Sequence, residues 1–271
     1  MASTKCKILT KHFRIPVKTL TAILTEEIVL EMDYARVVGE WVKPAESKKA
    51  TKIRSHLDHI LDVFKCQNLE IVFTIRSNEC IDFEYIQKTF QGLDISGIRI
   101  FGCSPKRNLD VLNEYPMVKN LVLVGNKLTV NEFREVWRKK LTRLSLCGGF
   151  TITFEELLTC KASNLEIPEV NFPGGVINKF LKGWIKGYNP DMESLIFKSS
   201  SWEFSLQKVF EGIPYVKAPA DLKRKFNKEV SGLPGAHFKG GYDIERRDGT
   251  MATLLCEKMP ASVKLIFLVW K

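Results

Sequence analysis

The sequence lacks a long apolar run. Although 45% of its 271 residues are hydrophobic, no stretch approaches the roughly 18 consecutive apolar residues that a membrane-spanning helix needs. The first 25 residues carry charges throughout, whereas a secretory signal peptide has an uninterrupted apolar core. We therefore predict a globular protein inside the cell, cytoplasmic or nuclear, with no membrane partner.

Residues that commonly carry chemistry are scarce and scattered. The seven cysteines are odd in number and never form a C-x-x-C motif, which favours reduced thiols. His56 and His59, followed by Cys66, leave a metal site open as an alternative, although a zinc site normally has a second closely spaced ligand pair. The Gly148-Gly149 pair lacks the Lys-Ser/Thr of a phosphate-binding loop. We predict no enzyme, no cofactor and no metal.

Positive charge is in excess. The 41 basic and 31 acidic residues give a formal charge of +10, with basic clusters within residues 134–143 and 217–228. A nucleic-acid-binding protein gathers such charge on one face, together with aromatic residues or a recognition motif, and the sequence meets neither condition. We predict solvated basic faces with an affinity for acidic partners, and a basic nucleic-acid-binding protein stays the alternative.

Residues 171–198 form the most informative stretch. Its apolar residues have the spacing of one helical face, and Gly187 followed by Asn189 and Pro190 predicts the helix end. A buried strand is predicted directly after it. A lone helix and strand cannot bury this much apolar surface without neighbours of the same kind. The predicted face consists of Ile177, Phe180, Leu181, Trp184, Ile185 and Tyr188.

A strand-like pattern recurs through the middle of the chain. Apolar-x-apolar pairs return every 21 to 30 residues, within the range of leucine-rich repeats, and the fullest match spans residues 118–128. Helices are expected between the strands, two of them starting at capping boxes formed by Thr129 with Glu132 and Thr153 with Glu156. The pairs are Leu69/Ile71, Ile98/Ile100, Leu121/Leu123, Leu144/Leu146, Leu165/Ile167 and Leu195/Phe197.

These patterns predict an α/β fold. Residues 50–213 are expected to form a leucine-rich-repeat-like solenoid of about six strand-helix units. Residues 1–49 are expected to form an N-terminal strand pair and a connection. Residues 214–271 are expected to form a connection, with a short helix at residues 222–226, and an antiparallel C-terminal cap that turns at Asp248-Gly249. One continuous structural unit is expected.

Two blocks resemble the type 2 F-box-associated domain of the large F-box protein families of nematodes. Residues 180–197, FLKGWIKGYNPDMESLIF, are similar to its hallmark block, and residues 242–255, YDIERRDGTMATLL, to its closing segment. In that family the domain follows an F-box, which docks on the Skp adaptor of a cullin-RING ubiquitin ligase. The resemblance implies a module that recognises the protein to be ubiquitinated.

The chain departs from the family pattern at its start. An F-box needs a compact run of apolar helical sequence with Leu-Pro near its beginning, whereas residues 1–50 have the pattern of strands and a charged connection. Residues 13–18 resemble the segment that follows an F-box. We expect the F-box to be truncated from this chain or lost, so that the Skp adaptor is a partner only where an F-box lies upstream.

The predicted function is protein-protein recognition, and the target protein is unknown. In a solenoid the exposed strand faces bind the partner, although an ordinary solvated sheet surface is the alternative at each position. A free-standing interaction protein unrelated to ubiquitination also stays open. The predicted contact residues are Glu70, Arg99, Val122, Ser145, Glu166 and Ile196.

Overall fold

The computed structural model divides into two compact units, residues 1–126 and residues 127–271. Among the described residues, no helix is both long and apolar enough to cross a membrane. The segment limits expected at residues 49 and 213 come from sequence patterns and stay a prediction. The structure describes residues 19–24, 28–32, 35–37, 47–74, 83–102, 105–125, 128–148, 152–200, 204–227, 229–230 and 233–270.

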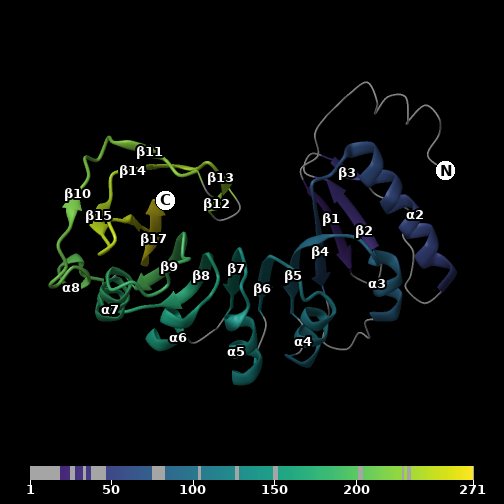
Figure 1. Cartoon of the computed structure of the whole chain (residues 1–271), viewed down its shortest axis with the longest axis horizontal. Coiled ribbons are helices and arrows are strands. Elements are labelled where there is room, and N and C mark those ends of the chain that lie inside the picture. Colours follow the sequence, from purple (N-terminus) through teal and green to yellow (C-terminus); the bar gives the residue numbers. More distant parts are fainter. Residues whose placement is uncertain are drawn as a thin grey trace. The chain divides into compact units, whose positions relative to one another are not determined.

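The first unit is a mixed sheet with helices beside it (Figure 1). Its described strands are β1 (Thr19–Leu24), β2 (Ile28–Met32), β3 (Ala35–Val37), β4 (Asn68–Thr74), β5 (Ile95–Phe101) and β6 (Asn120–Val124), and its described helices are α2 (Ser47–Phe64), α3 (Phe83–Phe90) and α4 (Pro105–Glu114). The strand order is β6-β5-β4-β1-β2-β3. Strand β4 runs parallel to β1 and β5, while β1, β2 and β3 are antiparallel neighbours. The core lies between the parallel strands and the helices, where Leu57, Ile71 and Ile98 are fully buried.

The second unit holds the second half of the strand-helix pattern. Its sheet contains β7 (Arg143–Cys147), β8 (Asn164–Asn171), β9 (Ser194–Ser200), β10 (Val216–Lys217), β15 (Tyr242–Glu245), β16 (Met251–Lys258) and β17 (Ser262–Trp270), in the order β10-β15-β16-β17-β9-β8-β7. Strands β7, β8 and β9 are parallel neighbours. Strand β17 pairs antiparallel with β9, so the last residues of the chain complete the edge that β9 would otherwise expose.

The two faces of this sheet are covered differently (Figure 1). Helices α5 (Val130–Arg138), α6 (Phe154–Thr159) and α7 (Gly174–Ile185) lie along one face, and α8 (Leu206–Val209) follows β9. The other face carries small antiparallel pairs from residues 218–240. These pairs are β11 (Lys223–Lys225) with β14 (His237–Lys239), and β12 (Glu229–Val230) with β13 (Leu233–Pro234). Residues 222–226, predicted to be helical, contain strand β11, which corrects that prediction.

Helix α7 supplies the largest fully buried side chain of the second unit, Trp184. Phe180 and Trp184 pack edge-to-face against Phe267 of β17, with ring centroids 5.5 and 5.2 Å apart. The predicted apolar face is confirmed at these positions, but it is wrong for Tyr188, which is 55% exposed. Gly187 adopts φ +102° and ends the helix, so the next side chain leaves the apolar stripe.

Both predicted capping boxes are present. The Thr129 hydroxyl accepts from the Glu132 backbone amide at 3.4 Å, and the Glu132 carboxylate accepts from the Thr129 amide at 2.6 Å. Thr153 and Glu156 exchange the same bonds at 3.2 and 2.8 Å. Each box satisfies two backbone donors that a helix start leaves unpaired. Helices α5 and α6 therefore begin where the sequence predicts.

The α/β class is confirmed, but the leucine-rich-repeat-like solenoid is not. All six apolar-x-apolar pairs lie on strands β4 to β9. However, the described residues form mixed sheets. Strands β1 to β3 extend the parallel strands of the first unit and β15 to β17 extend those of the second, and both sets include antiparallel pairs. Any series of consecutive strand-helix units buries apolar strand residues at a similar spacing. The spacing therefore predicts strand-helix units, but it does not determine whether they stack as a leucine-rich-repeat solenoid or form a mixed sheet.

Candidate functional site

The structure places the predicted contact residues in one row on each unit. In the second unit Ser145, Glu166 and Ile196 are direct partners across β7, β8 and β9. In the first unit Arg99 is opposite Val122 across β5 and β6. Glu70 of β4 joins that row through its carboxylate, which lies 2.7 Å from the Arg99 guanidinium.

The residues of these rows differ in their accessibility. The Arg99 side chain is 46% exposed and that of Glu166 is 21% exposed, while Val122 is half-buried. Ser145 and Ile196 are each only 3% exposed, which corrects the expectation that they lie on an exposed strand face. A partner-binding role for Glu70, Arg99, Val122 and Glu166 stays a prediction.

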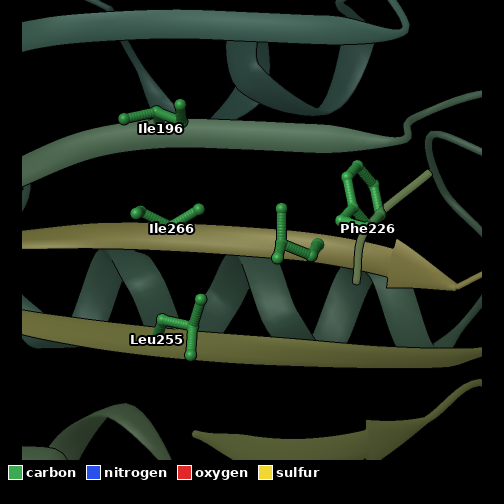
Figure 2. Close-up of a cluster of buried hydrophobic side chains, with 5 residues drawn as sticks. Ile196, Phe226, Leu255 and Ile266 are labelled. Atoms are coloured by element: carbon green, nitrogen blue, oxygen red, sulfur yellow. The ribbon is translucent and has the colours of Figure 1, made fainter. Parts of the chain in front are cut away.

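Ile196 is buried because a later part of the chain covers it. Ile196, Ile266 and Leu255 are neighbours across β9, β17 and β16, and Phe226 reaches them from the segment after β11 (Figure 2). Phe226 is 2% exposed, and its ring packs edge-to-face against Trp270 at 5.3 Å. Residues 218–240, called the arm below, therefore close this part of the sheet face.

Polar contacts also hold the arm against the sheet. The Arg224 guanidinium donates to the Asp243 carboxylate at 2.9 Å and to the Gly240 carbonyl at 2.8 Å. It also lies over the Trp270 ring, 5.1 Å from the centroid, where a cation is attracted to the ring face. The sequence patterns considered above do not predict these contacts. The signal was the alternation of Arg224 and Phe226 with lysines, which is the period of a strand.

A shallow depression lies at the start of β7, β8 and β9. Its volume of about 20 Å³ is close to the room that one water molecule needs. Its polar groups bond to one another, because Arg143 pairs with Glu166 at 3.2 Å and the Ser194 hydroxyl donates to the Asn164 side chain at 2.7 Å. A small-molecule substrate needs a cavity of about 300 Å³ or more, so this depression does not have the form of an active site.

Two thiols of the described chain are poor nucleophiles. Burial raises the pKa of the Cys160 and Cys256 thiols to about 12, so both are protonated at neutral pH and lack the nucleophilic thiolate. No group of three or more His, Cys, Asp or Glu that could hold a metal ion occurs in the described part of the chain. The His56 side chain, one member of the alternative metal site, lies outside that part, as do Cys6, Cys80 and Cys103.

The two blocks that carry the family resemblance meet in space. The Arg246 guanidinium lies over the Trp184 ring, 5.3 Å from its centroid, and the Arg247 amide donates to the Ile185 carbonyl at 3.4 Å. Arg246 also donates to both carboxylate oxygens of Asp248, at 2.7 to 3.0 Å. The blocks therefore form one structural core that joins α7 to the β15–β16 turn.

Asp248 gives this turn a pH dependence. Hydrogen bonds from Arg246 and then from Thr250 hold the pKa of the Asp248 carboxyl well below its usual range. A carboxyl whose pKa is lower in the folded state stabilises the fold above its unfolded pKa of about 4, and this contribution is lost as the pH falls further.

We expect Asp248→Asn to lower the unfolding temperature at neutral pH, and the gap between variant and wild type to close as the pH falls below about 4. Thermal unfolding of both proteins across a series of pH values measures this gap. Because the side chain is exposed, salt is expected to narrow the gap as well. A gap that is the same at every pH would show that the turn depends on side-chain shape and not on charge.

Comparison with known proteins identifies the segment that contains α7. Residues 132–197 match the F-box-associated family model, which confirms the resemblance of the first block. An uncharacterized protein of Caenorhabditis elegans is 25% identical over 187 residues, which cover 63% of this chain. The chain spans 43% of the length of that relative. No solved structure matches the chain.

Proposed function

We propose that this chain, in which residues 132–197 carry an F-box-associated segment, is a protein-recognition module that resembles the substrate-binding part of an F-box protein. The family match is the observation that carries the proposal. The described residues support it because they form packed α/β units that carry charged side chains on regular strands.

In this proposal the ubiquitin ligase connection depends on the Skp adaptor. The adaptor binds an F-box, and the chain supplies the part that selects the target. We propose Glu70, Arg99, Val122 and Glu166 as the target contacts, because all four lie on regular strands and none is fully buried. Arg99 is the most accessible of the charged residues, with 46% of its side chain exposed. A site on a regular strand is held more precisely than a site on a loop.

Charge reversal at these positions tests the target contact. We expect Arg99→Glu and Glu166→Arg to lose a defined set of proteins captured from nematode extract. Thermal unfolding should change little for Arg99→Glu, because the Arg99 side chain is 46% exposed and an exposed ion pair contributes about 1 kcal/mol or less. Quantitative mass spectrometry of the captured proteins measures the loss. Lys179→Glu, on the exposed side of α7, is the matched control. If all variants retain the same proteins, the strand face is not the contact.

A further inference from the structure

Strands β11 and β14 form a two-stranded ribbon with chemically different faces. Because side chains alternate along a strand, one face of the ribbon carries Arg224 and Phe238, and the other carries the residues on either side of them. The cross-strand pairs are Lys223 with Lys239, Arg224 with Phe238, and Lys225 with His237.

The contacts of the ribbon determine which face is free. Arg224 is bound to Asp243 at 2.9 Å, and Phe238 packs against the hydrophobic cluster around Phe226. This face is therefore turned toward the sheet. The opposite face, called the lysine face below, consists of Lys223, Lys225, His237 and Lys239, and all four residues are exposed.

The lysine face places like charges together. Lys223 is directly opposite Lys239, a position in which side chains are about 5 Å apart at Cβ and like charges are unfavourable. None of its three lysines has an ion pair within the described residues, whereas Arg224 on the other face of the ribbon does. Folding therefore leaves the repulsion uncompensated in the part of the chain that the structure describes. A negatively charged group from outside would relieve it.

A pocket beside β14 extends the positive surface. It has a volume of about 380 Å³, and its lining includes Lys217, His237, Lys239, Tyr242 and Glu257. The carboxylate of Glu257 lies 3.5 Å from the Lys264 ammonium, so its charge is already matched. Lys217 and Lys239 thus remain as positive groups at the pocket, which is large enough to accept an acidic side chain.

We propose that the lysine face and this pocket bind an acidic segment of a partner protein through its Asp and Glu side chains. The inference rests on the proposed function, since it names the chemistry of a partner for a recognition module. An acidic peptide fits better than nucleic acid, because the described lysine face carries no Phe, Tyr or Trp on which successive bases could stack. The compact group of cations suits a short segment more than a long phosphate backbone.

Charge reversal on the ribbon tests the proposal without unfolding it. We expect a fluorescent peptide of alternating Asp and Glu to bind the whole chain at low salt, and Lys239→Glu to weaken this binding roughly tenfold. Lys239→Glu places a carboxylate opposite Lys223, so the ribbon should be at least as stable as before. Lys179→Glu, which changes the net charge equally but lies on α7, should leave the binding unchanged. Fluorescence anisotropy measures each affinity.

Three outcomes would overturn the proposal. Equal binding by wild type and Lys239→Glu would exclude the lysine face. Equal weakening by Lys179→Glu would mean that only net charge attracts the peptide. If a single-stranded oligonucleotide bound more tightly than the acidic peptide, and Lys239→Glu weakened that binding, the ligand of the lysine face would be nucleic acid. Adaptor capture is a separate measurement, so peptide binding that follows this pattern would stand even if the chain had no part in a ubiquitin ligase.

Discussion

Replacing Trp184 with alanine is expected to lower the free energy of unfolding by about 3–5 kcal/mol. The side chain is 0% exposed and packs edge-to-face against Phe267. Its ring also supports the Arg246 guanidinium, 5.3 Å from the centroid. The variant therefore loses apolar burial and leaves a cavity where the two family blocks meet. A domain of ordinary stability unfolds with a free energy of about 5–15 kcal/mol, so this loss is a large fraction of the total.

Chemical denaturation of the whole chain, followed by circular dichroism, measures this loss. Tyr188→Ala is the matched control, because Tyr188 lies just after the same helix but is 55% exposed. It should change the stability by less than about 0.5 kcal/mol. A Trp184→Ala protein that stayed folded and had lost only a partner would show that this tryptophan belongs to a binding face and not to the core.

Replacing Phe226 with alanine is expected to release the arm while the rest of the second unit stays folded. Phe226 joins the arm to Ile196, Leu255 and Ile266, and a buried phenylalanine truncated to alanine costs about 3–5 kcal/mol. Phe238, the other aromatic residue of the arm at this cluster, is only partly buried, so this loss should appear first as local opening. Helix α7 lies on the opposite face of the sheet and should keep its protection.

Hydrogen exchange resolved along the chain measures the opening. Exchange should rise at the Phe226 amide, which donates to the Ala236 carbonyl at 2.8 Å, and across β11 and β14, with no change in α7. Leu222→Ala is the control, because Leu222 is 43% exposed at the start of the arm. Unchanged exchange in the arm would mean that Arg224 and its polar contacts hold it without the aromatic residues.

Local features were the most predictable part of the fold. The capping boxes at Thr129 and Thr153 depend on residues three positions apart, and the apolar face around Trp184 depends on the helical period, so neither needs knowledge of the rest of the chain. Helical spacing alone also predicts Tyr188 on that face. The positive φ of Gly187 ends the helix before it, and periodicity does not contain this information.

Long-range pairing was the unpredictable part. Ile196 occupies an alternate strand position, on the face of the sheet that points away from α7. From the alternation of side chains along a strand alone, such a position is predicted to be exposed. It is buried because β17 pairs beside it and Phe226 covers it, and both come from residues later in the chain. The same non-local pairing joins β1 to β4 and β17 to β9, and it gives mixed sheets where the repeat pattern predicts a solenoid.

The family resemblance has a structural explanation in this chain. Residues 180–197 contain Trp184, and residues 242–255 contain Arg246 and Asp248. The Arg246 guanidinium lies over the Trp184 ring and donates to the Asp248 carboxylate, so the two blocks are in contact. A motif that maintains packing identifies the fold and leaves the surface free to vary. Target selection is therefore expected at exposed residues outside the two blocks, such as Arg99 and Lys239.

Co-purification with the Skp adaptor tests the proposed role most directly. The chain of residues 1–271 and a form extended upstream, where the gene encodes one, are each co-expressed with the adaptor and purified under identical conditions. We predict that the extended form retains adaptor and cullin and that residues 1–271 alone do not, since the adaptor binds the F-box. If neither form retains the adaptor, the ubiquitin ligase role is contradicted and a free-standing interaction protein is left.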